Sequence, residues 1–219
     1  MTELLNKLCS LSGVSGAEDS VRDFIRTRAI TFADDIRTDA MGNFMVFRAG
    51  KRSTKKPLML TAHMDEVGFI IKRITDDGML KFGFVGGIDP RVVIGRHVRF
   101  GDTVGVVGIK AVHLTSIEDR KHTPDVKDLY IDIGACSKSE AENKVDIGDY
   151  GVFDSDFSEF GDGLIKAKAL DDRIGCAILL QLLRKTPPVD TWFVFTVQEE
   201  VGLRGAATAA FAIQPALCI

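Results

Sequence analysis

Three short stretches of the sequence place ionisable side chains directly after apolar runs. Burying charge without a partner is costly, so charged groups at the ends of predicted strands need an explanation. Five carboxylates and one imidazole gathered at one edge of a sheet cannot all stay ionised without cations. Because histidine nitrogen and carboxylate oxygen are ordinary zinc ligands, a metal site is the expected solution. The residues are His63 and Asp65 after PLML, Asp171 and Asp172 after LIKAKAL, and Glu199 and Glu200 after WFVFTVQ.

Spacing within the pairs suggests different roles for their members. His63 and Asp65 are two residues apart, so on an extended segment both side chains point the same way. The imidazole can then bind a metal while the carboxylate orients it. Glu199 and Glu200 are adjacent and point to different sides, so one can bind metal while the other takes a proton from water.

Each pair also has an ordinary structural explanation. A His-x-Asp triplet occurs by chance in surface loops, and Asp172 can serve only as the cap of the helix that follows it. A Glu-Glu pair is common on exposed faces. The metal site is favoured because all three pairs follow apolar strands of one predicted sheet, and independent accidents would not share one edge.

The elements around these residues predict an α/β domain. Residues 2–11 and 17–30 have helical spacing, and the runs at 34–38 and 43–48 are joined by the hairpin sequence DAMGN. After residue 160, strands and helices alternate, which implies parallel pairing with ligands beyond the carboxyl ends of the strands. The later segments are the strand GLIKAKAL, the helix DRIGCAILLQLLRK, the strand TWFVFTV, the helix GLRGAATAAFA and the strand ALCI.

The middle of the chain has a different character. Short runs rich in valine, isoleucine and phenylalanine, punctuated by glycine, extend from about 67 to 160 and predict a barrel or sandwich. We therefore expect an α/β catalytic domain formed by residues 1–66 and 161–219, interrupted by an inserted β domain at 67–160.

Composition excludes several classes of protein. The chain has 219 residues, of which 45% are hydrophobic and 27% charged, and its net charge of −3 gives no basic face for nucleic acid. No run approaches the roughly 18 apolar residues of a membrane helix, and the amino terminus is unlike a signal peptide. The four cysteines form no close pair. These features predict a cytoplasmic protein with reduced thiols and no membrane or nucleic-acid partner.

Five blocks in this order and spacing resemble the M42 family of metallo-aminopeptidases. The resemblance extends from SGVSGAED near the start to AFAIQP near the end. It implies an exopeptidase-like α/β sandwich domain interrupted by a barrel-like dimerisation domain, in a protein that forms dimers and then dodecamers. The blocks are AHMDEVGF, GGIDPRVV, DLYIDIGA, ALDDRIGC and TVQEEVGLRGA.

The resemblance also implies a role for each site residue. His63 would bind one of two divalent metal ions, zinc or cobalt, Glu200 would bind the other, and Asp171 would bridge them. Glu199 would be the general base and Asp65 would tune His63. The implied reaction removes amino-terminal residues from peptides.

Two ligands that the resemblance implies are absent from this sequence, an acidic residue after AFAIQPALCI and a later histidine. His97, His113 and His122 match no ligand motif. We therefore expect an amino-terminal fragment that binds metal weakly and has little or no activity. Two other functions remain open, a non-catalytic oligomerisation module and a glycosidase, although one tryptophan and two tyrosines offer little aromatic surface for sugars.

Overall fold

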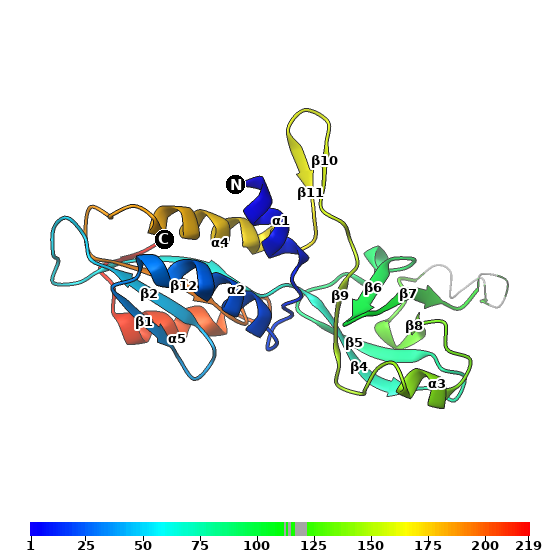
Figure 1. Ribbon diagram of the computed structural model, residues 1–219. Helices are drawn as coiled ribbons and strands as arrows, with labels where there is room; N and C mark the ends of the chain where they lie inside the picture. The colour runs from blue at the N-terminus through cyan, green and yellow to red at the C-terminus, as the bar shows by residue number, and fades with distance from the viewer. Residues whose placement is uncertain (112, 114, 117–121) are drawn as a thin grey trace. The chain divides into compact units, whose positions relative to one another are not determined.

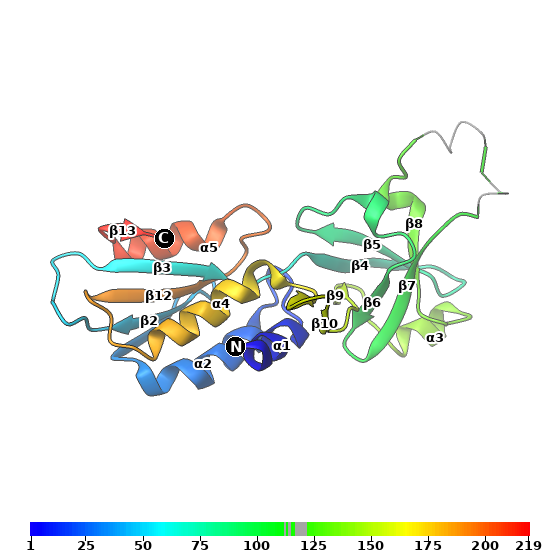
Figure 2. The same cartoon turned by 90° about the horizontal axis from the view of Figure 1, so that it is seen from above.

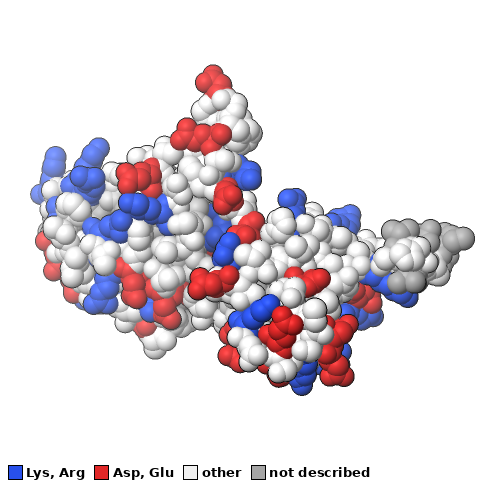
Figure 3. Space-filling model, turned by 45° about the vertical axis from the view of Figure 1, so that its right-hand side comes forward, with Lys and Arg blue, Asp and Glu red and all other residues white. Residues whose placement is uncertain are grey.

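The chain forms two compact units (Figure 1). One unit consists of Met1–Glu66 with Asp156–Ile219, and the other consists of Val67–Ser155. Acidic and basic side chains are interspersed over the face drawn in Figure 3. The structure, a computed structural model, describes residues 1–111, 113, 115–116 and 122–219.

The first unit is an α/β sandwich. Its helices are α1 (Thr2–Ser10), α2 (Asp19–Ala29), η1 (Ile30–Phe32), α4 (Leu170–Leu183) and α5 (Arg204–Ile213). Its strands are β1 (Asp35–Thr38), β2 (Phe44–Arg48), β3 (Leu58–His63), β10 (Ser158–Phe160), β11 (Leu164–Lys166), β12 (Thr191–Thr196) and β13 (Leu217–Cys218). Five of them form a sheet of order β1-β2-β12-β3-β13 (Figure 2). Strands β12 and β13 run parallel to β3, and β1 and β2 form the predicted antiparallel hairpin.

Alternate residues of β12 face opposite layers of the sandwich. Phe193 and Phe195 lie in the core formed with α1, α2 and α4, while Trp192 and Val194 pack in a smaller core with Ala209 of α5. Successive side chains of a strand point to opposite faces, so a strand covered on both sides must be apolar throughout. This explains why TWFVFT is buried at every position.

The second unit is a closed barrel, as the sequence predicts. Its strand order is β4-β5-β8-β7-β6-β9, and Phe69, Phe82 and Phe153 belong to the aromatic contacts that fill it. The strands are β4 (Gly68–Ile74), β5 (Leu80–Val85), β6 (His97–Phe100), β7 (Thr103–Ile109), β8 (Leu129–Asp132) and β9 (Tyr150–Phe153). The short helices are η2 (Pro90–Val92), η5 (Val126–Asp128) and α3 (Lys138–Glu142).

The prediction that LIKAKAL belongs to the main sheet is wrong. Strand β11 pairs antiparallel with β10 in a separate two-stranded sheet, with Glu159 opposite Ile165. The alternation of lysine with small apolar residues explains the difference, because a central parallel strand must be apolar on both faces. Phe160 and Leu164 of this hairpin are each 54% exposed, so it lies outside the core.

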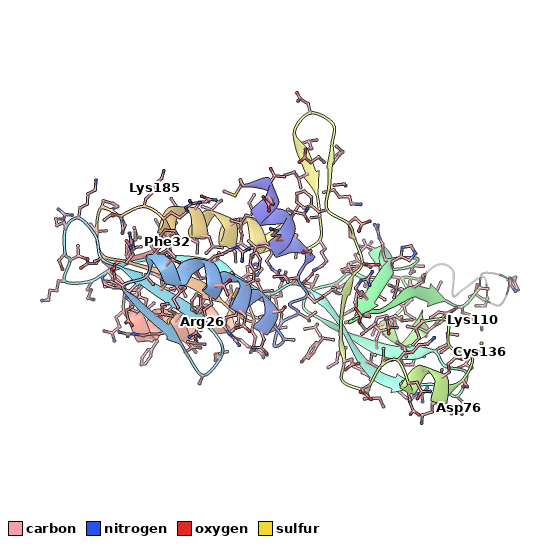
Figure 4. The ribbon with its side chains drawn as sticks, in the orientation of Figure 1. Arg26, Phe32, Asp76, Lys110, Cys136 and Lys185 are labelled. Carbon is pink, nitrogen blue, oxygen red and sulfur yellow. The ribbon has the colours of Figure 1, made fainter. Side chains whose placement is uncertain are left out.

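Two predictions from composition can be compared with the structure. None of the helices among the described residues is long and apolar enough to cross a membrane. All four cysteines are free thiols. Cys9 and Cys176 are buried, whereas Cys136 and Cys218 are exposed (Figure 4 labels Cys136).

Asp190 links the amino end of β12 to the loop between β2 and β3, and its carboxylate predicts a pH effect. It accepts hydrogen bonds from the amides of Gly50 and Thr54 at 2.9 and 3.0 Å and from the Ser53 hydroxyl at 2.8 Å. These bonds hold the pKa of Asp190 below its ordinary value of 3.8. The contribution of the ionised Asp190 carboxylate to the free energy of unfolding is therefore complete above a pH of 3.8 and is lost as the pH falls below that value.

We expect the difference in unfolding free energy between the wild type and Asp190→Asn to shrink as the pH is lowered below about 4. Urea unfolding at a series of pH values measures this difference. A difference that stays constant between neutral and acidic pH would contradict the effect.

Candidate metal centre

The parallel pair β3 and β12 brings two of the predicted segments to one edge of the sheet. Thr196 lies opposite His63 in the register, so both strands end at the same level. Glu199 and Glu200 follow the end of β12 after Val197 and Gln198. The sequence predicts that ionisable residues following parallel strands lie at one edge of the sheet. The pairing of β3 and β12 agrees with this prediction, because the carboxyl ends of parallel strands share an edge.

His63, Glu199 and Glu200 each offer a ligand atom, and these atoms lie within 4.8 Å of one another. Within the described part of the chain, this is the one group of three or more such side chains with the spacing of a metal site. The Nε2 atom of His63 lies 3.9 Å from Glu199 Oε2. The three histidines outside the motifs, His97, His113 and His122, do not belong to the group.

Asp171 reaches the same histidine from a different element. Its Oδ1 lies 3.0 Å from His63 Nε2, and its side chain is 88% exposed. It lies at the start of α4 rather than at a strand end, and the peptide bond between Asp171 and Asp172 is cis. Asp172 accepts a hydrogen bond from the amide of Gly175 at 3.0 Å. A bond of this kind is what a helix-capping aspartate makes.

Asp65 lies beneath the cluster and is fully buried. Its carboxylate accepts hydrogen bonds from the Ser15 hydroxyl at 2.6 Å and from the amides of Glu199 and Glu200 at 3.0 and 3.1 Å. Burial raises its pKa, but these bonds and the contact with His63 lower the pKa overall, so the carboxylate stays ionised. One buried charge thus fixes the backbone that carries both glutamates.

The imidazole of His63 is oriented by its own segment. Its Nδ1 lies 3.0 Å from the carbonyl oxygen of Asp65, and a carbonyl can only accept, so Nδ1 carries the proton. The other nitrogen, Nε2, therefore faces the acids and is the one available to a metal. Burial lowers the pKa of His63, but the hydrogen bonds to Asp65 and Asp171 and the charges of Asp65 and Asp172 raise it to about 9. A metal binding at Nε2 must consequently displace a proton.

The donor set fits a divalent cation. Burial and the charges of neighbouring acids raise the pKa of Glu200, against an opposite effect of His63. One imidazole nitrogen with several carboxylate oxygens suits zinc and cobalt.

Left-handed backbone conformations precede both acidic segments. Gln198 has φ 54° and Ala169 has φ 55°, and neither is glycine. Such conformations cost of order 1–3 kcal/mol each and persist where the surroundings fix them. The amide of Gln198 donates to the buried Glu18 at 3.1 Å, which holds this turn in place.

The sequence did not identify Ser15 or Glu18 as supports of the site. Both lie in the stretch SGVSGAED, which carried part of the family resemblance, and that was the available signal. Their partners, Asp65 and the amide of Gln198, lie far away in the sequence.

Together the fold and the cluster define an α/β protein with a candidate metal centre at the carboxyl ends of its parallel strands. The sequence model of the M42 glutamyl aminopeptidase family matches residues 42–219, so the chain belongs to the M42 family. The resemblance inferred from the sequence is confirmed.

Three similar proteins illustrate the relationship. A putative aminopeptidase of Acetivibrio thermocellus is 42% identical over 221 residues, which cover 100% of this chain and 64% of that protein. The solved structure of an aminopeptidase from the archaeon Desulfurococcus kamchatkensis matches with a TM-score of 0.91 and 38% identity, over 99% of this chain and 61% of that one. The TET1 peptidase of Pyrococcus horikoshii matches with a TM-score of 0.86 and 38% identity, over 99% and 66%. The chain thus spans 61–66% of the length of these proteins.

Proposed function

We propose that this chain carries catalytic residues of an aminopeptidase that removes amino-terminal residues from peptides with the help of two divalent metal ions, zinc or cobalt. The observation that carries the proposal is the convergence of His63, Glu199 and Glu200 within 4.8 Å in a member of the M42 family. Asp171, 3.0 Å from His63, adds a fourth group from another element.

The proposed roles follow the donor set. His63 and Glu200 would each bind one ion, and Asp171 would bridge the two. When bound, the ions would polarise the scissile carbonyl and lower the pKa of the attacking water. Asp65 would keep His63 and the glutamate backbone in place, because it is fully buried and contacts both.

Glu199 would act as the general base. Its side chain is 34% exposed, so it can reach a substrate while its backbone amide stays bonded to Asp65. It would take a proton from water and pass it to the leaving amine, as a carboxylate positioned within hydrogen-bond reach can do.

The inserted barrel is the proposed dimerisation unit of a cytoplasmic homo-oligomer. The structural relative from Pyrococcus horikoshii is described as assembling into a tetrahedron or a large octahedral shell. Val104, Val106, Ile147 and Tyr150 of the barrel unit are large hydrophobic side chains that are exposed, and burial against another copy would remove such side chains from water. These exposed side chains also support the second candidate function, an oligomerisation module without catalysis. The mass of the protein in solution tests assembly, and a strict monomer would contradict it.

Metal-dependent hydrolysis tests the main proposal. We expect the 219-residue chain to release nitroaniline slowly from amino-acyl 4-nitroanilides after addition of Zn²⁺ or Co²⁺, and to lose that activity with a chelator. The rate should be low because the chain spans only 64% of its Acetivibrio relative. Failure to bind either ion would contradict the proposed function, and fast turnover would contradict only the expected weakness.

A further inference from the structure

Three buried charged side chains beside the candidate metal centre have no role in the proposed reaction. Glu66 is 3% exposed and Arg173 is 0% exposed. The side chain of Lys168 is 9% exposed. All three belong to the same compact unit as the metal centre. We refer to Glu66, Lys168 and Arg173 as the ion cluster.

Glu66 lies at the centre of the ion cluster. Lys168 Nζ donates to both of its carboxylate oxygens, at 2.7 and 3.0 Å, and Arg173 Nη2 donates to Oε1 at 3.3 Å. The amide of Gly13 donates to the same Oε1 at 3.1 Å. The amide of Glu66 donates back to the Gly13 carbonyl at 2.9 Å, so the two chain segments are tied in both directions.

Arg173 extends the ion cluster to the carboxyl end of α1. Its Nη1 donates to the Leu8 carbonyl at 2.5 Å and to the Leu11 carbonyl at 3.3 Å, and its Nε donates to the Met64 carbonyl at 2.9 Å. Lys168 Nζ also donates to Leu11, at 2.8 Å. The ion cluster contains two cations and one carboxylate, and the carbonyls at the negative end of the helix dipole stabilise the extra positive charge.

The ion cluster joins the two segments that supply metal ligands from different elements. Glu66 lies three residues after His63, and Lys168 and Arg173 lie on either side of Asp171. The loop before Asp171 belongs to no strand of the main sheet, since β11 pairs with β10. Besides the ion cluster, it is held by the packing of Ala167 and Leu170 against the core and by the bond from Cys176 Sγ to the His63 carbonyl at 3.2 Å. The distance from His63 to Asp171 therefore depends on how this loop is held.

We propose that Glu66, Lys168 and Arg173 are positioning residues that hold the Asp171 segment against the His63 segment and thereby set the affinity of the site for divalent metal. The proposal rests on the proposed function only in requiring that the site binds a divalent ion. Partners behind metal ligands typically change metal affinity by 10–100-fold when they are removed.

Cobalt binding tests the proposal directly. We expect the double variant Glu66→Gln/Lys168→Met, which removes a cation and its counter-ion together, to bind Co²⁺ about tenfold more weakly than the wild type. The visible absorption bands of the bound Co²⁺ should also change, because they report ligand geometry rather than overall stability. Calorimetric and spectroscopic titrations with CoCl₂ give both quantities.

The control is Asp190→Asn, which weakens a hydrogen-bonded network at the opposite end of β12. It should lower the melting temperature of the metal-free protein and leave Co²⁺ affinity and spectrum unchanged. Gly13→Ala is a second variant that keeps all charges. Its added Cβ would lie 2.8 Å from Arg173 Nη2 and 2.7 Å from Val21 Cγ2, so Arg173 would have to move. It should also weaken Co²⁺ binding. This variant tests the proposal if the double variant does not fold.

Wild-type Co²⁺ affinity and spectrum in the folded double variant, or in Gly13→Ala if the double variant does not fold, would overturn the positioning role and leave the proposed function intact. A wild-type chain that binds neither Co²⁺ nor Zn²⁺ would overturn both.

Discussion

Replacing Glu199 with glutamine is expected to lower the rate of peptide hydrolysis by about 10²- to 10⁴-fold, while Co²⁺ still binds. Glutamine keeps the size and shape of the side chain but cannot take a proton. The backbone should stay in place, because the amide of Glu199 donates to Asp65 and the substitution does not alter it. Release of nitroaniline and Co²⁺ titration measure the two properties separately.

The adjacent Glu200 supplies the matched comparison. Glu200→Gln should weaken Co²⁺ binding, because this residue is proposed as a ligand and its amide is held by the same Asp65. If Glu199→Gln abolished metal binding and Glu200→Gln did not, the two roles would have to be exchanged. If neither change affected the rate, the general-base role would be excluded.

Asp65→Asn is expected to lower Co²⁺ affinity by about 10–100-fold. It should also lower the free energy of unfolding by about 1–3 kcal/mol. The buried carboxylate accepts from Ser15, Glu199 and Glu200, and it contacts His63. An asparagine has one acceptor oxygen, so its amide group would face at least one of these donors without a partner. Co²⁺ titration and urea unfolding of the metal-free protein measure the two effects.

Asp77→Asn is the control for Asp65→Asn. Asp77 is exposed in the turn between β4 and β5, where it accepts a hydrogen bond from Thr75. Its replacement should change stability by no more than about 0.5 kcal/mol and leave metal binding unaffected. An Asp65→Asn variant that resembled this control would show that the buried carboxylate does not organise the site.

Much of the sheet could be predicted because its central strands have a simple physical requirement. Residues 191–196 are covered on both faces, and only an apolar run satisfies that condition. A polar residue directly after such a run must lie at the end of the strand. This is why His63, Glu199 and Glu200 could be expected at one edge before their positions were known.

The path of the backbone from β11 to Asp171 could not be predicted in the same way. The residues of β11 have strand character, but the sequence does not state that the partner is β10 rather than a strand of the main sheet. Ala169 adopts a left-handed conformation that favours glycine, so no residue type marks the turn that leads into α4. Asp171 nevertheless reaches His63, by a different path from the one expected.

The ion cluster was missed for a related reason. Glu66 and Arg173 are visible within the family motifs, but the acceptors of Arg173 are backbone carbonyls of Leu8, Leu11 and Met64. A carbonyl group has no signature in a sequence, because every residue has one. Only the folded chain reveals which of them meet a buried guanidinium.

The first and last strands of the barrel are neighbours, with Phe69 opposite Gly151 and Ile70 opposite Tyr150. The points where the polypeptide enters and leaves this unit are therefore only a strand spacing apart, roughly 5 Å. A gap that small can be closed by a tight turn, so evolution could enlarge, exchange or delete the whole module without pulling apart the residues on either side of it.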